Sequence, residues 1–384
     1  MKKTLLTICL VWMCFSLSAQ KIIDLSGKWS FSIDRQDNGE KEKWFSHTLN
    51  DFINLPGSMP EKLKGDEVTA KTQWTGSLYD SSYYYNPYME KYRKEGNIKF
   101  PFFLTPDKHY VGAAWYQKEV NIPADWKGER ILLFLERPHI ETTVWVNGQK
   151  TGMQNSLCVP HQYDITRYVR PGKCTITIRV DNRIKEINVG PDSHSITDQT
   201  QGNWNGIVGR ICLQTTPKTY FDDIQIYPEP EQKLARVKVV IKGTGTAKVK
   251  LSAESFNTDK KHIVPAIQQE IKLNKGVTET EMVLPMGNDM LLWDEFHPAL
   301  YKLKAEVTNG KKTEIKEIQF GMRRFEIKGK WFYVNGRKTQ LRGTVENCDF
   351  PLTGYAPMDV ESWERVFRIC RSYGLNHMRF HSFC

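Results

Sequence analysis

The last sixty residues of the chain place the tightest limit on its fold. Phe325–Gly343 carries two apolar runs on either side of Asn335-Gly336, a dipeptide typical of a tight β-hairpin turn. Further along, Asp359 is suited to cap a helix whose apolar residues recur at helical spacing until Gly374 ends it. Residues 375–384 alternate as a second strand. Since the hairpin's second run leads directly into the polar cluster before this helix, we predict a strand–helix–strand (βαβ) unit.

A single βαβ unit buries too little apolar surface to be a finished domain. We therefore expect it to open a (β/α)₈ barrel whose remainder lies outside the 384 residues. Polar residues gather where both predicted strands end, at the edge where parallel α/β folds and barrels carry their active sites. These residues are Glu346, Asn347, Cys348 and Asp349 after the first strand, and Arg379 and His381 in the second.

The preceding 300 or so residues predict β-structure only. Short runs from Leu25 to Tyr227 alternate apolar and polar residues without intervening helices, as in a jelly roll or sandwich. Residues 74–110 interrupt this rhythm, and their Tyr83–Tyr88 cluster either stacks on sugar rings or packs the loop onto its own domain. Residues 228–232 resemble a linker, and 235–318 predict an immunoglobulin-like β-sandwich.

The amino terminus has the parts of a secretory signal peptide. Lys2 and Lys3 precede an apolar centre that is too short to span a bilayer, and Ser18-Ala19-Gln20 follows it. A buried amino-terminal helix is the alternative. We expect an exported protein, periplasmic or secreted, without a membrane span. The predicted divisions are a signal peptide at 1–20, a jelly-roll domain at 21–228, an immunoglobulin-like sandwich at 229–322 and the incomplete barrel at 323–384.

Charge and cysteine content exclude several other classes of protein. The net charge of +10 comes from lysines interleaved with acids and is not accompanied by a recognition motif, which argues against nucleic-acid binding. The eight cysteines, six after removal of the signal, show no metal-binding spacing, and no disulfide pair can be assigned. Metal sites and oligomeric state are left open by the sequence.

Several stretches, in their order, resemble glycoside hydrolase family 2, the group of β-galactosidases, β-glucuronidases and β-mannosidases. That family combines a jelly-roll sugar-binding domain, an immunoglobulin-like sandwich and a (β/α)₈ barrel, so the resemblance implies a mainly β chain that ends in a partial barrel. The similar stretches are Leu25–Trp29, Trp115–Lys118, Thr143–Gly148, Asn203–Arg210, Leu292–Tyr301, Phe320–Ile327, Phe332–Gly336, Leu341–Gly343 and Gly374–His381.

The resemblance implies a retaining exo-β-glycosidase that acts on oligo- or polysaccharides without an organic cofactor. Such enzymes use a carboxylic acid and a carboxylate nucleophile about 5–5.5 Å apart. The family takes them from an Asn-Glu pair after the fourth barrel strand and a glutamate after the seventh. This chain reaches the second strand and contains no Asn-Glu dipeptide. We expect both catalytic glutamates beyond its carboxyl terminus, and no hydrolysis by the 384 residues alone.

The resemblance also implies residues that contact the substrate. Arg379 and His381 match the arginine and histidine that line the floor of the sugar pocket in relatives, although a structural ion pair or core histidine is the alternative. Where β-galactosidases carry histidines after strand one, this chain has Glu346, Asn347 and Asp349. This departure puts galactose specificity in doubt, while the two carboxylates would repel the uronate that a β-glucuronidase binds.

The jelly roll supplies a second group of candidates. Asp198, Asn203 and Asn205 occupy the loop from which relatives send a polar side chain towards the barrel, and a turn or β-bulge explains them equally well. Two functions therefore stay open at this point. The leading one is a β-galactosidase-like exo-glycosidase, with a β-glucuronidase or another exo-glycosidase of the family as its variant. The other is a carbohydrate-binding protein without catalysis.

Overall fold

The structure is a computed structural model that describes residues 20–75, 85–99, 102–185, 197–198 and 202–381. Most of the predicted signal peptide and two members of the tyrosine cluster, Tyr83 and Tyr84, lie outside these residues. The chain forms two compact units. One contains residues 217–326 and 334–336, and the other contains residues 21–216, 327–333 and 337–384.

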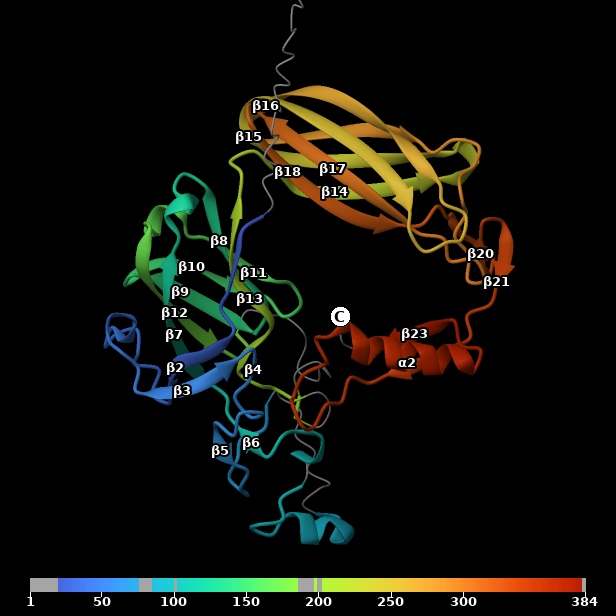
Figure 1. Cartoon of the computed structure of the whole chain (residues 1–384). Coiled ribbons are helices and arrows are strands. Elements are labelled where there is room, and N and C mark those ends of the chain that lie inside the picture. Colours follow the sequence, from blue (N-terminus) through green and yellow to red (C-terminus); the bar gives the residue numbers. More distant parts are fainter. Residues whose placement is uncertain (1–19, 76–84, 100–101, 186–196, 199–201, 382–384) are drawn as a thin grey trace, which may run out of the picture. The chain divides into compact units, whose positions relative to one another are not determined.

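Residues 21–216 fold as two antiparallel sheets, as Figure 1 shows. One has the strand order β1-β13-β8-β11, with β4 also paired to β13, and the other has the order β10-β9-β12-β7-β2-β3. The first sheet consists of β1 (Ile22–Asp24), β4 (Gly57–Ser58), β8 (Arg130–His139), β11 (His161–Asp164) and β13 (Gly206–Thr216). The second consists of β2 (Gly27–Asp34), β3 (Asp51–Leu55), β7 (Ala113–Ile122), β9 (Glu141–Val146), β10 (Gln149–Asn155) and β12 (Gly172–Asp181).

Short elements complete this part of the chain. Two short strands, β5 (Asp66–Glu67) and β6 (Lys108–His109), pair with each other. The 3-10 helices of the chain are η1 (Trp44–Ser46), η2 (Pro87–Tyr92), η3 (Phe102–Leu104), η4 (Ala124–Trp126), η5 (Thr166–Tyr168) and η6 (Pro230–Gln232). The dipeptide Asn147-Gly148, the same turn signal as Asn335-Gly336, joins β9 to β10, and both of its residues have positive φ, 49° and 74°.

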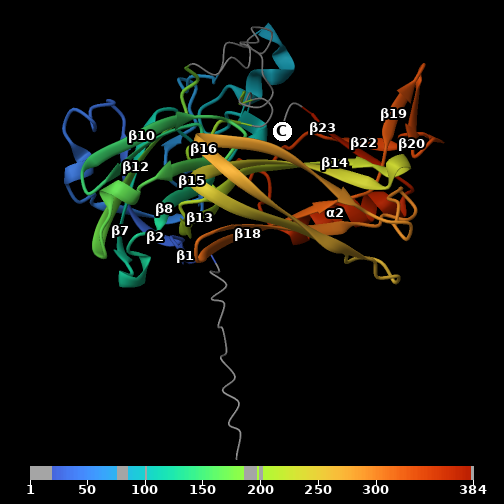
Figure 2. The same cartoon turned by 90° about the horizontal axis from the view of Figure 1, so that it is seen from above.

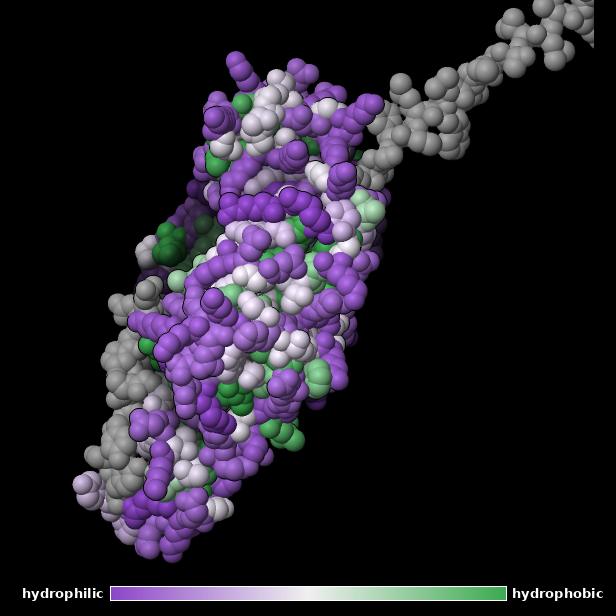
Figure 3. All heavy atoms as spheres, turned by 90° about the vertical axis from the view of Figure 1, so that its left-hand side faces the viewer, coloured by the Kyte–Doolittle hydropathy of each residue, from purple (hydrophilic) through white to green (hydrophobic). Residues whose placement is uncertain are grey.

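The jelly-roll core fills the space between the two sheets. Alternate residues of each strand point inwards, so Ile131, Leu133 and Leu135 of β8 pack with residues such as Trp29 and Ile178 of the opposite sheet. A second, smaller hydrophobic cluster consists of Leu49, Trp115 and Trp145, with Trp44 and Phe45 packed against it. The face of the molecule seen in Figure 3 is mainly hydrophilic, with hydrophobic residues scattered over it.

The second unit is a sandwich of long strands. It contains β14 (Tyr220–Glu229), β15 (Leu234–Ser255), β16 (Ile263–Pro285), β17 (Tyr301–Asn309) and β18 (Lys312–Phe320), in the order β14-β15-β17-β18 with β16 paired to β15. Figure 2 shows the length of β15 and β16. The alternating apolar runs 236–241 and 247–253 are separated in the sequence by Gly243 and Gly245. In the structure they form one strand, because β15 continues through both glycines.

One strand lies in a different domain from the one that the sequence suggested. Residues 220–227 were expected to close the jelly roll, but β14 pairs along its whole length with β15 of the sandwich. The reason is that alternation identifies a strand without identifying its partner. The apolar side of β14, including Phe221, contributes to the sandwich core.

The carboxyl-terminal residues form the predicted βαβ unit with one difference in its first strand. Its elements are β22 (Gly343–Glu346), α2 (Val360–Ser372) and β23 (His377–Phe380). The hairpin run was expected to continue into β22. Instead β19 (Phe325–Lys328), β20 (Trp331–Val334) and β21 (Arg337–Thr339) form a separate three-stranded sheet, with the predicted turn at Asn335-Gly336. The strand breaks because β21 pairs with β20 and β22 pairs with β23.

The ends of α2 have the expected caps. The Asp359 carboxylate accepts a hydrogen bond from the Ser362 amide at 2.8 Å. At the other end, Gly374 has φ 78°, its amide bonds the Arg371 carbonyl and the Leu375 amide bonds the Cys370 carbonyl, which is a Schellman motif. The sequence-based prediction of this helix is confirmed.

A substitution at Gly206 tests the packing of β13 against β4. A Cβ there would lie 2.4 Å from the Gly57 carbonyl oxygen, so Gly206→Ala is expected to lower the free energy of unfolding by about 2 kcal/mol or more. Gly152→Ala in β10 is the control, because its Cβ would make only ordinary contacts at 3.6 Å. Urea denaturation measures both. Equal stabilities for the two variants would contradict the close approach.

Candidate active site

The carboxyl ends of two neighbouring parallel strands meet at one edge of the βαβ unit. β22 and β23 pair in parallel from Gly343 opposite His377 to Glu346 opposite Phe380. Just beyond this pairing, the His381 amide donates to the Glu346 carbonyl at 2.8 Å. The pairing thus brings together residues that lie 35 positions apart in the sequence, as a shared edge of a parallel sheet requires.

The two faces of this strand pair have different neighbours. The Phe380 ring lies 5.4 Å from the Trp363 ring of α2, so Phe380 and its pair Glu346 face the helix. Figures 1 and 2 both show α2 beside β23. Arg379 therefore lies on the opposite face and is exposed. His381 follows two residues later. In a (β/α)₈ barrel, the face of the strands that the helices do not cover forms the interior of the barrel.

The loop after β22 turns sharply at Cys348. This residue has φ 61°, and its amide donates to the Glu346 carboxylate at 2.9 Å. Burial, reinforced by the nearby charges of Glu346 and Asp349, raises the pKa of the Cys348 thiol to about 11. Asn347 is exposed beside it. Cys348 is therefore a neutral structural residue, and Glu346 stabilises the turn on the helix side of the strand pair.

The same loop binds to the end of the jelly roll. The Ser58 hydroxyl donates to the Thr353 carbonyl at 2.5 Å, and the Tyr355 hydroxyl donates to the Glu61 carboxylate at 2.9 Å. Burial, together with this bond to a carboxylate, raises the pKa of the Tyr355 hydroxyl. Asp349 lines a groove of about 740 Å³ with jelly-roll residues such as Arg210.

The three jelly-roll candidates use their polar atoms inside the domain. The Asp198 carboxylate accepts from the amide and hydroxyl of Thr75, at 2.5 and 3.1 Å. Asn203 donates to the Asn182 carbonyl, and Asn205 accepts from the Tyr116 hydroxyl while donating to two carbonyls. All three candidates are buried. These contacts favour the structural alternative, and contact with substrate stays a prediction.

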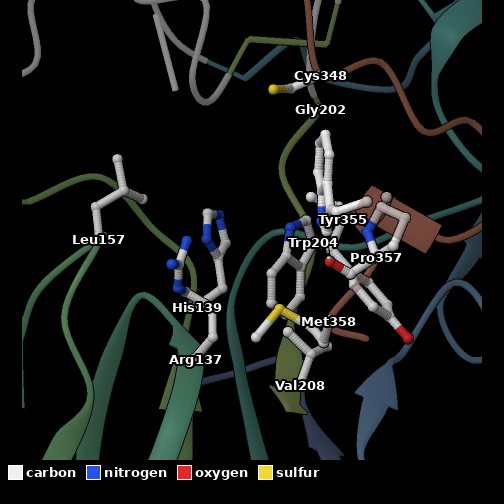
Figure 4. Close-up of a pocket in the computed structure, with 13 residues that line it drawn as sticks. Arg137, His139, Leu157, Gly202, Trp204, Val208, Cys348, Tyr355, Pro357 and Met358 are labelled. Atoms are coloured by element: carbon white, nitrogen blue, oxygen red, sulfur yellow. Dashed lines mark hydrogen bonds between the residues drawn. The ribbon is translucent and has the colours of Figure 1, made fainter. Parts of the chain in front are cut away.

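A pocket that the sequence did not indicate lies where the jelly roll meets this loop. It holds about 170 Å³ and is shown in Figure 4. Arg137 and His139 of β8 line it from one side, and Tyr355 and Met358 of the loop line it from the other. One feature of the sequence could have indicated this pocket. Along β8 the inward-facing positions change from apolar to polar, because Arg137 and His139 follow Leu133 and Leu135 in that row.

His139 is neutral in this pocket. Burial lowers the pKa of its imidazole to about 3, against a hydrogen bond with Asn203 that favours the charged form, and the charge of Arg137 lowers it further. Its Nε2 lies 3.1 Å from the Asn203 carboxamide oxygen, so the neutral ring donates there and leaves Nδ1 as an acceptor. The ring stacks on Trp204 with 4.5 Å between centroids.

Within the residues that the structure describes, no three His, Cys, Asp or Glu side chains gather in a way that could hold a metal ion. None of the helices in the described part of the chain has the length and apolar character needed to cross a membrane.

Comparison with known protein families assigns both β-domains. The sugar-binding domain of glycosyl hydrolases family 2 matches residues 22–217, and a second domain described as glycosyl hydrolases family 2 matches residues 219–323. The first match alone covers half of the chain. The chain belongs to glycoside hydrolase family 2. The fold and the order of the domains agree with the resemblance seen in the sequence.

Similar proteins within the family carry two different names. A β-glucuronidase of Paenibacillus borealis is 24% identical over 355 residues, which are 87% of this chain and 51% of that protein. A β-galactosidase of Thermoanaerobacter pseudethanolicus is 24% identical over 301 residues, 74% of this chain and 38% of that protein. The chain thus spans about half or less of the length of these curated relatives.

Solved structures show the same fold. The β-glucuronidase of Ruminococcus gnavus in complex with D-glucaro-δ-lactam superimposes with a TM-score of 0.66 at 19% identity, over 94% of this chain and 56% of that one. At this identity the likeness concerns the fold of a family 2 chain and leaves its substrate undetermined.

Acidification is expected to destabilise the jelly roll between about pH 6.5 and pH 5. Burial lowers the pKa of His139 to about 3 and that of His161 to about 4, whereas both have a pKa near 6.5 when unfolded. As the pH falls through about 6.5, the unfolded chain takes up protons first, and stability is lost by about 1.4 kcal/mol per pH unit for each histidine.

Urea unfolding at a series of pH values measures this slope. His161→Gln should reduce the slope by about half, because it removes one of the two histidines whose pKa is lowered by burial. Burial of Asp181 raises the pKa of its carboxyl group, but hydrogen bonds from Arg183 and Lys185 outweigh this effect and lower the pKa. The stabilisation that Asp181 provides is therefore lost only below about pH 4. A stability that is flat between pH 6.5 and 5 would contradict the assignment.

Proposed function

We propose that this chain is the amino-terminal part of an exo-acting, retaining β-glycosidase that removes terminal sugars from oligo- or polysaccharides. The observation that carries the proposal is the position of Arg379 and His381. Because side chains alternate along a strand, both residues are expected on the face of β22 and β23 that α2 does not cover. His381 lies at the carboxyl edge of the strand pair, where its amide bonds the Glu346 carbonyl. Family membership supplies the class of reaction.

Arg379 has a defined role in this proposal. A guanidinium group on the interior face would stabilise the carboxylate nucleophile and orient it by charge-assisted hydrogen bonds. His381 would bond a sugar hydroxyl, and Asn347, exposed at the same edge, is suited to do so too. The two glutamates that perform the displacement would come from later barrel strands, so these residues bind and position the substrate without transferring its proton.

Galactose is the first candidate for the terminal sugar and glucuronic acid is the second, and another exo-glycosidase activity of the family stays open. The prediction of a β-galactosidase-like activity was based on the family resemblance alone. The carboxylates of Glu346 and Asp349 were expected to repel the carboxylate of a uronic acid. In the structure Glu346 faces α2 and binds the Cys348 amide, while Asp349 lines the groove beside the jelly roll. Neither carboxylate shares the face of Arg379, which reduces the expected repulsion. This arrangement and the names of several relatives favour β-glucuronidase as the second candidate.

The 384-residue chain by itself is expected not to hydrolyse aryl glycosides, because it contains no Asn-Glu pair to supply the acid. Purified chain is incubated with 4-nitrophenyl β-D-galactoside and β-D-glucuronide, and release of nitrophenol is followed. A longer product of the same gene should cleave one of the two with retention of the anomeric configuration. Hydrolysis by the 384 residues alone would contradict the proposal.

In that longer product, Arg379→Ala is expected to reduce kcat/KM by a factor of about 100 or more, since it removes a charge partner of the nucleophile. Arg365→Ala is the matched control, because Arg365 is an exposed arginine on α2. Equal losses in the two variants, or no loss in Arg379→Ala, would remove Arg379 from the site.

We also propose that residues 1–20 direct export and are cleaved. After expression in a Gram-negative host, the chain should be recovered from the periplasm or the medium with an amino terminus near Lys21. A substitution of Lys2 and Lys3 by Glu should slow processing. An unprocessed amino terminus in the cytoplasm of cells that make the unaltered chain would contradict export.

A further inference from the structure

The long strands β15 and β16 of the sandwich bend together at a glycine corner. Gly243 of β15 pairs there with Gly276 of β16, which has φ 106°, and the register shifts between Gly243 and Gly245. Val239 before the bend and Val249 after it belong to the same hydrophobic core. Both halves of the bent strand pair are therefore anchored by packing, and the corner between them has a fixed position in the domain.

Two other segments of the sandwich contact this corner. At the end of β17, the Asn309 side chain donates a hydrogen bond to the Thr244 carbonyl at 2.8 Å. Thr219, just before β14, lies so close that a Cβ on Gly243 would be 2.5 Å from its hydroxyl oxygen. Residues that are distant in the sequence are thus brought together around the corner.

Five exposed lysines surround the corner, and we call them the basic corner: Lys218, Lys248, Lys272, Lys275 and Lys311. Lys218 and Lys275 each precede a residue of the corner, and Lys311 lies in the turn between β17 and β18. Thr246 pairs with Lys272, and Lys248 follows Thr246 on the same outward face. The two lysines are therefore diagonal neighbours, with about 7–8 Å between their Cα atoms.

The lysines of the basic corner differ from other lysines of the same domain. Within the part of the chain that the structure describes, none of the five makes an ion pair within 4.0 Å. One acid, Glu270, stands opposite Lys248 in the register without reaching this distance. Elsewhere on the sandwich the lysines do pair, as Lys238 does with Glu279 at 2.7 Å. The interleaving of opposite charges therefore fails locally at the corner.

A cluster of like charges on an exposed surface attracts a partner of the opposite sign. The ammonium groups repel one another, and their summed field raises the local concentration of anions. Each contact is weak at an exposed site, so a small anion that meets one lysine gains little. A polymer with repeated anionic groups contacts several lysines at once, and its contacts reinforce one another.

We propose that the basic corner binds an acidic polysaccharide, whose carboxylate or sulfate groups contact these lysines. Charge complementarity selects a polyanion, and the oligo- or polysaccharide substrate of the proposed glycosidase makes an acidic glycan the occupant. The surface would hold the enzyme on a polymeric substrate while terminal sugars are removed. That role rests on the proposed function, whereas the binding itself does not.

The test measures binding of the purified 384-residue chain to immobilised polymers by biolayer interferometry. Polygalacturonate is compared with its methyl-esterified form, and dextran sulfate with dextran. At least one acidic polymer should bind about tenfold or more tightly than its neutral counterpart, and its affinity should fall about tenfold or more between about 50 and 300 mM sodium chloride. The pair that shows the difference identifies carboxylate or sulfate as the ligand group.

Two triple variants locate the binding. The first combines Lys248→Gln, Lys272→Gln and Lys275→Gln and should lower the affinity for the acidic polymer about tenfold or more. The matched control removes the same charge from the same domain, but from lysines that form ion pairs with Glu279, Asp289 and Glu254. This control combines Lys238→Gln, Lys260→Gln and Lys261→Gln, and it should change the affinity by less than about twofold.

Several results would overturn the proposal. They are equal affinity for acidic and neutral polymers, binding that does not depend on salt, equal losses in the two triple variants, and binding to anionic phospholipid vesicles without binding to either acidic polymer. Should the first triple variant fail to fold, Lys311→Glu in the β17–β18 turn takes its place. None of these measurements depends on catalysis, so the glycosidase proposal is tested separately by the hydrolysis assays.

Discussion

The parallel pairing of β22 with β23 is the constraint on which the candidate site depends. Parallel neighbours require a crossover of a dozen or more residues, and here that crossover is the loop 347–359 and helix α2. The crossover covers one face of the pair, through Trp363 and Phe380, and leaves Arg379 on the other. The position of every proposed substrate contact in this unit follows from that single geometric requirement.

The loop within this crossover has a second role, since it joins the barrel unit to the jelly roll. Ser58 and Glu61 hold it through Thr353 and Tyr355, and Gly354 lies against Trp204. The loop is ordered by these contacts with the jelly roll as well as by its own hydrogen bonds, such as that from the Gly354 amide to the Phe350 carbonyl at 2.7 Å. A loop that is ordered in advance loses less entropy when a ligand binds. This contact also creates the pocket around Arg137.

Most of the fold was predictable from local patterns. Alternating residues identified the strands, Asn147-Gly148 and Asn335-Gly336 identified two hairpin turns, and Asp359 and Gly374 marked the ends of α2. The errors concern partners. The strand at 220–227 was placed in the jelly roll, and β21 was joined to β22, because alternation gives the two faces of a strand but not its neighbours. Family membership was predictable because many short stretches occur in the order typical of the family.

The sequence by itself determined which residue types stand at the strand ends, and therefore the class of chemistry that the chain can take part in. Only the tertiary structure decided how those residues are used. Glu346 binds a backbone amide on the helix side, and Asn203 and Asn205 bond inside the jelly roll, whereas Arg379 stays exposed on the opposite face. The sequence did not indicate a pocket at Arg137 and His139, which the structure places beside a loop more than 200 residues away in the sequence. The physical reason is that a polar side chain acts through the partner it meets, and partners distant in the sequence are fixed by packing.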